Sequence, residues 1–154
     1  LGISNWHDWA HPDGHSKIVG WAFDGLPIYG PYGYKNPTLL DTEPTDNTIV
    51  AVKSPWKLRP LNNNRISSPG GAHTGVFIED FVFDFNVKNP IENGYTGEHN
   101  QRYGVTPDSP TTPIYYYVLT VDEDLEPAFP YHVGGGTVNV DQWGNRYYSS
   151  APET

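Results

Sequence analysis

The residues with the clearest capacity for chemistry are three histidines spaced four positions apart. His7, His11 and His15 lie in NWHDWAHPDGHS, with two aspartates between them. Imidazole nitrogens and carboxylate oxygens together suit zinc or another first-row divalent metal. A helix would place these imidazoles on one face, but the Pro-Asp-Gly run after His11 argues against a helix. The alternative is a turn in which the polar side chains cap backbone groups.

Asp24 is the lone acid in HSKIVGWAFDGLPIYGPYGYK, a run rich in glycine, proline and tyrosine. An aspartate before a glycine can accept a hydrogen bond from the backbone two residues further on and so fix a turn. The functional alternative is that Asp24 faces His15 or His132 as a base or a metal ligand. Nothing near Asp24 requires that role, so the turn is the favoured interpretation. The rival hypothesis is a divalent metal ion held by His7, His11, His15 and Asp24.

A second polar group lies in EHNQRYGVTP, where Glu98, Asn100 and Arg102 alternate along the chain. Side chains this close together can form a polar network that anchors a loop. With Tyr103 beside them, they could instead form a carbohydrate-binding patch. The loop-anchoring network is the favoured interpretation.

The chain is unusually aromatic, with five tryptophans, eleven tyrosines and six phenylalanines. Exposed tryptophans and tyrosines suit sugar stacking or a protein interface, whereas buried ones supply the core of a chain that has no methionine. The sequence leaves both alternatives open. The candidate contact residues are Trp21, Tyr29, Tyr32, Tyr34 and Tyr103.

Composition restricts the possible partners and chemistry. The net charge of −9 is unfavourable for binding phosphates, so we expect neither nucleic acid nor an anionic membrane surface as a partner. No apolar run reaches membrane-spanning length, and the absence of cysteine excludes disulfides. A nucleophile elbow, a phosphate loop and an HExxH zinc motif are all missing. We therefore predict a non-enzymatic protein with no cofactor beyond the possible divalent ion.

The elements that must position these residues are predicted to be strands. Prolines recur along the chain, and no long segment has helical apolar spacing. Alternating apolar residues predict a half-buried strand in residues 75–87, with Phe81, Phe83 and Phe85 on one face. Residues 113–121 are apolar or aromatic on both faces, which predicts a central strand. Further strands are expected at 18–23 and 47–53, and a late hairpin at 137–149 with a turn at Gly144-Asn145.

Between these strands we expect long loops, and the fold class is all-β with almost no helix. The architecture is predicted to be a single antiparallel β-sandwich or a compact barrel. Its 154 residues suit one domain, residues 1–150, followed by a frayed tail or linker at 151–154. Because the chain begins at Leu1 and lacks methionine, we expect a processed N-terminus or a piece of a longer product.

Three segments together resemble the YHYH domain family. HSKIVGWAFDGLPIYGPYGY is similar to the family's signature, and GEHNQRYGVTPDSP and PIYYYVLTVDEDLEPAFPYHVGG resemble two later segments in the same order. In pattern the chain is most similar to YHYH-type virion proteins of tailed phages that infect marine cyanobacteria. That resemblance implies a structural protein of a tail fibre, baseplate or capsid surface. In bacteria, the family also occurs in secreted or cell-surface proteins.

The chain departs from the family pattern at the residues that give the family its name. The strand reads Tyr115-Tyr116-Tyr117-Val118, so both histidines of the Tyr-His-Tyr-His motif are missing. We therefore expect a structural or interaction module on a virion surface or in an extracellular assembly, contacting other assembly proteins or further copies of itself. A secreted metal-binding or metal-dependent module and a module that binds a host-surface glycan are the alternatives.

Overall fold

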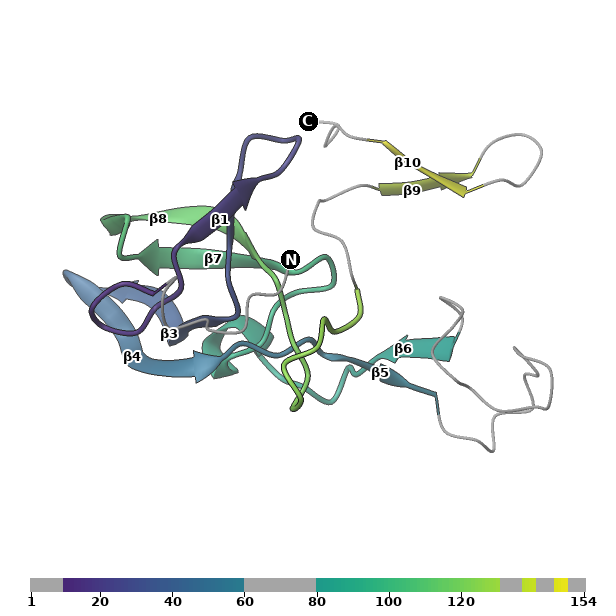
Figure 1. Ribbon diagram of the computed structural model, residues 1–154, viewed down its shortest axis with the longest axis horizontal. Helices are drawn as coiled ribbons and strands as arrows, with labels where there is room; N and C mark the ends of the chain where they lie inside the picture. The colour runs from purple at the N-terminus through teal and green to yellow at the C-terminus, as the bar shows by residue number, and fades with distance from the viewer. Residues whose placement is uncertain (1–9, 60–79, 131–136, 141–145, 150–154) are drawn as a thin grey trace.

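The structure, a computed structural model, describes residues 10–59, 80–130, 137–140 and 146–149 (Figure 1). Within these ranges the chain forms strands and one short 3-10 helix, with no α-helix. The elements are β1 (Ile18–Trp21), β2 (Pro27–Tyr29), β3 (Tyr32–Leu40), β4 (Glu43–Ala51), β5 (Trp56–Leu58), β6 (Phe81–Phe83), η3 (Pro90–Asn93), β7 (Gln101–Thr106), β8 (Ser109–Val118), β9 (Thr137–Val140) and β10 (Arg146–Ser149).

The predicted all-β fold is confirmed. One sheet has four strands in the order β1-β2-β8-β7, and three antiparallel pairs, β3-β4, β5-β6 and β9-β10, complete the described strands. These described strands do not close into a barrel (Figure 1). One pairing departs from the predicted antiparallel arrangement, because β2 runs parallel to β8. The predicted boundary at residue 150 and the tail at 151–154 lie outside the described residues.

β8 is the central strand that its two apolar faces predict, since it pairs with β2 on one side and β7 on the other. Its inner face carries Tyr116 and Val118, which pack with Tyr29 of β2 in the buried core. Its outer face carries Tyr115, which lies opposite Tyr103 of β7 and is more than half exposed. The alternation of side chains along a strand therefore separates a core face from a solvent face within one run of tyrosines.

Of the strand predicted over residues 75–87, β6 confirms Phe81–Phe83, residues 75–79 lie outside the described residues, and the prediction is wrong beyond Phe83. Asp84 accepts a hydrogen bond from the backbone N–H of Asn86 at 3.1 Å, and this bond turns the chain out of the strand. Phe85 is consequently 77% exposed instead of continuing the buried face. The predicted late hairpin is confirmed in β9 and β10, whereas its turn at Gly144-Asn145 lies outside the described residues.

Two segments expected to be loops are largely strand. Residues 36–47 belong to the β3-β4 hairpin, which turns at Asp41 with a φ of 56°. Most of EHNQRYGVTP forms β7. Both segments are rich in residues with low strand propensity, so pairing with neighbouring strands decides their structure. No helix in the described part of the chain has the length and hydrophobicity to cross a membrane.

Candidate functional site

The signature run folds into a tight hairpin that joins β1 to β2. The N–H of Ala22 donates to the carbonyl of Leu26 at 2.9 Å, and the N–H of Gly25 donates to the carbonyl of Ala22 at 2.9 Å. Gly25 has a φ of 83°, a conformation that favours glycine. The N–H of Leu26 donates to Oδ1 of Asp24 at 3.0 Å. Asp24 therefore caps the turn, as the Asp-Gly sequence predicts.

Asp24 also ties this hairpin to the central strand. Its Oδ2 accepts a hydrogen bond from the hydroxyl of Tyr117 at 2.5 Å. Tyr117 is buried on the outer face of β8, between Ile28 of β2 and Gln101 of β7. The carboxylate is thus bonded at both oxygens, one to the turn and one to the sheet.

The hairpin presents two large aromatic side chains to solvent. Trp21 is 67% exposed, and Phe23 is fully exposed. We call Trp21 and Phe23 the hairpin tip. Because the turn is held by backbone bonds and by Asp24, the tip is displayed on a fixed support, which lowers the entropy that a contact would otherwise lose.

His15 lies on the opposite side of the sheet, buried beneath the core tyrosines. Its ring packs at 5.3 Å from that of Tyr29 and at 4.8 Å from that of Tyr34, and its Nδ1 bonds the carbonyl of Ser16 at 2.7 Å. Burial lowers the pKa of His15 to about 4, although the bond to Ser16 and the charge of Asp13 oppose that shift. The imidazole is therefore neutral near pH 7 and donates from Nδ1.

Two aspartates join this region to neighbouring tyrosines. Oδ2 of Asp13 accepts from the hydroxyl of Tyr34 at 2.7 Å, and Oδ1 accepts from the N–H of His15 at 3.0 Å. Partial burial raises the pKa of Asp13, but these hydrogen bonds outweigh it and bring the pKa below its usual value. Oδ2 of Asp108 lies 2.9 Å from the hydroxyl of Tyr29 and 3.1 Å from Nε2 of His11. These bonds fasten the β7-β8 turn and β3 to the histidine segment.

The structure separates the residues of the predicted metal set. His7 lies outside the described residues. The rings of His11 and His15 are neighbours at 6.5 Å, but His15 packs on the inner face of the sheet, whereas Asp24 bonds Tyr117 on the outer face. In the described ranges, no group of three or more histidine, cysteine, aspartate or glutamate side chains is arranged to hold a metal ion. His132, the other proposed partner of Asp24, also lies outside the described residues.

Arg102 is fully buried and braces three segments at once. Its Nη1 donates to the carbonyl of Tyr34 at 2.7 Å, and its Nη2 donates to the carbonyls of Lys35 at 3.0 Å and Ile91 at 2.6 Å. Burial lowers the pKa of this guanidinium, while the phenol of Tyr116 raises it. The side chain joins β7 to β3 and η3.

Asn100 and Glu98 have different roles from Arg102. Asn100 is buried in a left-handed conformation with a φ of 61°, and its Nδ2 donates to the carbonyl of Pro130 at 2.7 Å. Glu98 is exposed, and its backbone carbonyl accepts from the indole N–H of Trp56 at 3.0 Å. Asn100 thus anchors the segment at Pro130, and Arg102 anchors β3 and η3.

The candidate contact tyrosines divide between core and surface. Tyr29 and Tyr34 are buried, so they pack the core around His15 and are closed to a partner. Tyr32 is half-buried, and Tyr103 is 45% exposed on the outer face of the sheet. Of the aromatic residues proposed for contacts, Trp21 is the most exposed in the described part of the chain.

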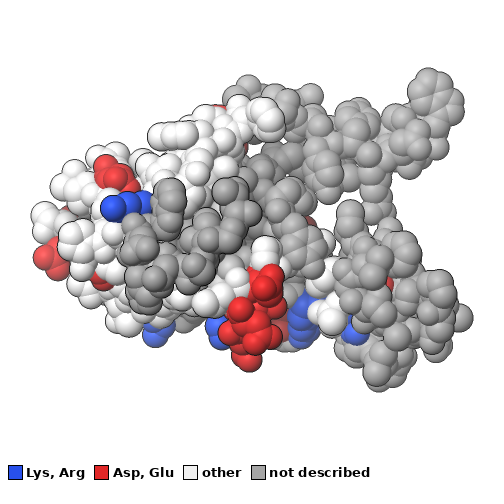
Figure 2. All heavy atoms as spheres, in the orientation of Figure 1, with Lys and Arg blue, Asp and Glu red and all other residues white. Residues whose placement is uncertain are grey.

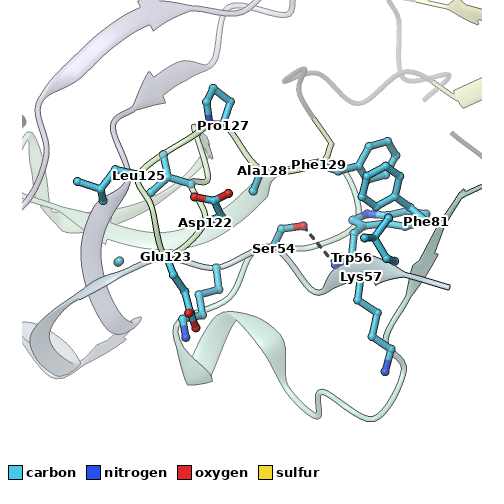
Figure 3. A pocket seen from close by; sticks show the side chains of 14 residues that line it. Ser54, Trp56, Lys57, Phe81, Asp122, Glu123, Leu125, Pro127, Ala128 and Phe129 are labelled. Carbon is cyan, nitrogen blue, oxygen red and sulfur yellow. Dashed lines mark hydrogen bonds between the residues drawn. The ribbon is translucent and has the colours of Figure 1, made fainter. Parts of the chain in front are cut away.

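A pocket of about 700 Å³ lies between β5, β6 and the loop of residues 121–129 (Figure 3). Three aromatic rings gather at one end. Phe81 stacks on Phe129 with centroids 4.1 Å apart, and Trp56 meets Phe129 edge-on at 5.2 Å. Leu58 and Leu125, each about half exposed, also line the pocket. We call this hollow the aromatic pocket.

The loop that walls the aromatic pocket is strongly acidic. Its exposed side chains include Asp122, Glu123, Asp124 and Glu126, and Figure 2 shows acidic atoms gathered at this loop with basic atoms on either side. Oδ1 of Asp122 accepts from the N–H of Asp124 at 2.9 Å and from that of Glu126 at 3.0 Å, so the loop has a defined turn. The pocket is therefore apolar inside and acidic at this rim.

The model of the family described as YHYH protein matches residues 5–130, which is most of the chain. The chain belongs to the YHYH family. No curated protein and no solved structure matches it. In this YHYH protein, the signature residues Asp24, Asn100 and Arg102 build the framework, as their hydrogen bonds show.

Sequence reasoning missed the aromatic pocket of this YHYH protein. Trp56 and Phe129 lie in segments without a recognisable pattern, and the alternation around Phe81 predicts only a strand. The stretch EPAFPYHVGG supplied a signal, because a phenylalanine between prolines is held in place by the chain around it. That signal gives no information about the opposite wall of the pocket, because residues 51–58 come close to Phe129 only in the folded state.

Proposed function

We propose that this YHYH protein is a non-enzymatic interaction module that assembles with further copies of itself in an extracellular structure. The finer proposal is a phage virion, at a tail fibre, baseplate or capsid surface, and it is supported by the similarity of the signature and the two later segments to YHYH-type virion proteins. The protein would then lie on the virion surface or outside the cell.

The observation that carries this proposal is the hairpin tip. Trp21 and Phe23 are exposed at 67% and 106% of their reference areas, on a turn that Asp24 and Tyr117 hold in place. Large aromatic side chains on a fixed support are typical of the residues that dominate binding energy in protein interfaces. Assemblies with many copies multiply such contacts, so each one can be weak.

The hydrogen bonds of the signature side chains also support the proposal. Asp24 caps a turn, Arg102 donates to three backbone carbonyls, and Asn100 bonds the carbonyl of Pro130. Residues used in this way stabilise a scaffold that displays other side chains. We therefore assign these signature residues to the scaffold, in which Asp24 supports the hairpin tip directly.

The test is sedimentation velocity over a series of protein concentrations. We expect the wild-type chain to form oligomers whose fraction rises with concentration. The double variant Trp21→Ser with Phe23→Ser should need at least tenfold higher concentration to reach the same fraction. The matched control is Leu40→Ser, because Leu40 is similarly exposed, at 60%, but lies at the β3-β4 turn.

Two results would overturn the proposal. The first is a wild-type chain that stays monomeric throughout the series. The second is a hairpin-tip variant that associates as the wild type does, with both proteins giving the same circular dichroism spectrum. A loss in the Leu40→Ser control equal to that of the tip variant would also contradict a specific role for the tip.

A further inference from the structure

We propose that the aromatic pocket of one copy receives the hairpin tip of a second copy. This inference rests on the proposed function and names the surface to which the tip binds. It makes the contact heterologous, because two different surfaces of the same chain meet.

The two surfaces match in chemistry. The hairpin tip carries two aromatic side chains, Trp21 and Phe23, that are exposed to solvent. The aromatic pocket has a volume of about 700 Å³, within the range of roughly 300–1,000 Å³ that binding pockets occupy. Its rings at Trp56, Phe81 and Phe129 offer edges and faces against which further aromatic rings pack well.

A chain cannot fill its own pocket with its own tip. Figure 1 places the β1-β2 hairpin at one end of the four-stranded sheet, and β5 and β6 lie well apart from it. The turn is fixed to Tyr117 of β8 by Asp24, so the hairpin does not reach across the molecule. A hairpin tip can therefore reach this pocket only from another copy of the chain.

Charge favours this particular segment as the occupant. The chain carries a net charge of −9, and the loop of residues 122–126 brings four acidic side chains to a pocket that is also lined by Lys53 and Lys57. These two lysines offset only part of the acidic charge, so a strongly acidic segment of a second copy would be repelled. Residues 17–29 contain one lysine and one aspartate and hence have no net charge. This hairpin is a part of the chain that can approach the acidic rim without repulsion, and Lys17 at its base is exposed.

The size of the contact sets its strength. Two aromatic side chains bury about 150–250 Å² each, so the tip and pocket together remain below the roughly 1,200 Å² of a stable interface. A single contact is therefore weak. Because each copy offers one tip and one pocket, the contacts propagate head to tail into a ring or a filament.

The decisive experiment mixes two variants that have complementary defects. The tipless variant, Trp21→Ser with Phe23→Ser, keeps the pocket. The pocket-blocked variant is Ala128→Trp, which fills the pocket, or Leu58→Asp, which places a carboxylate in it. We expect each variant alone to be monomeric and the equimolar mixture to give a one-to-one heterodimer, because one tip and one pocket remain.

The indole N–H signal of Trp56 in the isotope-labelled tipless variant supplies the local readout. It should shift when the unlabelled pocket-blocked variant is added, and it should not shift when more tipless variant is added. The control Leu40→Ser, made in either partner, should leave the heterodimer unchanged. Raising the salt concentration should strengthen the association severalfold, since it screens the repulsion between acidic copies.

Each failure has a distinct signature. If the pocket-blocked variants self-associate as the wild type does while the tipless variant does not, the inference is overturned and the proposed function stands. If the wild type is monomeric at every concentration, both are overturned. A Trp56 signal that shifts on adding glucose, galactose, mannose or N-acetylglucosamine, but not the pocket-blocked variant, would assign the pocket to a saccharide and overturn the inference.

Discussion

The hydroxyl of Tyr117 donates a hydrogen bond to Oδ2 of Asp24 at 2.5 Å, across 93 positions in the sequence. This contact links the hairpin turn to the central strand of the sheet. It makes the position of Trp21 and Phe23 depend on a strand that follows them by nearly a hundred residues. The two oxygens of Asp24 divide these tasks, since Oδ1 caps the backbone of the turn and Oδ2 accepts from Tyr117.

We predict that Tyr117→Phe loosens the hairpin while the sheet remains folded. The change removes one hydrogen bond to a charged acceptor at a partly exposed site, which should cost roughly 1 kcal/mol of the free energy of unfolding. Amide exchange at Leu26 should accelerate severalfold, and self-association should weaken. The control is Tyr115→Phe, since the Tyr115 hydroxyl makes no hydrogen bond within the part of the chain that the structure describes. Unchanged exchange at Leu26 in Tyr117→Phe would contradict the assigned role of this contact.

Acid should destabilise the protein through His15. Burial lowers its pKa in the folded state to about 4 from an ordinary 6.5, so between these values the unfolded chain binds a proton that the folded chain does not. The stabilisation is complete above pH 6.5 and is lost as the pH falls to 4, by roughly 3 kcal/mol in total. Urea unfolding from pH 7 to pH 4 measures this loss, and His15→Gln should remove that part of it. A histidine proton signal that titrates near pH 6.5 in the folded protein and belongs to His15 would refute the prediction.

Arg102→Lys should be strongly destabilising although it conserves the charge. A lysine offers one ammonium in place of the planar group that reaches the carbonyls of Tyr34, Lys35 and Ile91. Leaving buried carbonyls unsatisfied should cost about 3 kcal/mol or more. Chemical denaturation of the variant and the wild type measures the difference. Lys35→Arg, at an exposed position on β3, is the comparison that should stay within about 0.5 kcal/mol. A loss below about 1 kcal/mol in Arg102→Lys would show that the three carbonyls find other donors.

Two glycines with positive φ should respond differently to alanine. A Cβ on Gly104 would come very close to the backbone carbonyl of Pro37, so β7 and β3 would have to move apart. We expect Gly104→Ala to cost about 3 kcal/mol. A Cβ on Gly25 meets nothing within 4 Å, so Gly25→Ala should carry only the backbone strain of about 1–2 kcal/mol. Thermal unfolding compares the two, and equal shifts in Tm would contradict the packing argument.

The features of the fold that the sequence predicted are those that depend on residues close together in the chain. The alternation in residues 113–121 predicted a central strand, and β8 occupies that position, because burial on both faces is a property of the strand itself. The Asp24-Gly25 turn was also predictable, since its hydrogen bond spans two residues. The predicted strand at 47–53 overlaps the end of β4, but β3 and the turn at Asp41 were not predicted. These polar strands are stabilised by pairing with each other, which short-range patterns do not record.

The candidate site was less predictable than the fold. The sequence suggested that His7, His11, His15 and Asp24 could bind one metal ion. In the structure, His15 and Asp24 contact opposite faces of the sheet. The aromatic pocket joins segments that lie far apart in sequence, around Trp56, Phe81 and Phe129. Contacts between such segments depend on tertiary packing, and no local spacing rule contains them.

The parallel pairing of β2 with β8 has a consequence for synthesis of the protein. Ribosomes add residues one at a time, so Ile28 of β2 cannot pair with Tyr117 of β8 until Tyr117 has been synthesised. The sheet therefore cannot close until the chain is made through residue 118, and such long-range closure is intrinsically slow. Truncated products that stop before β8 would expose Trp21 and Phe23 without an anchored hairpin. The hairpin that carries Trp21 and Phe23 is thus anchored only after the central strand β8 has been synthesised.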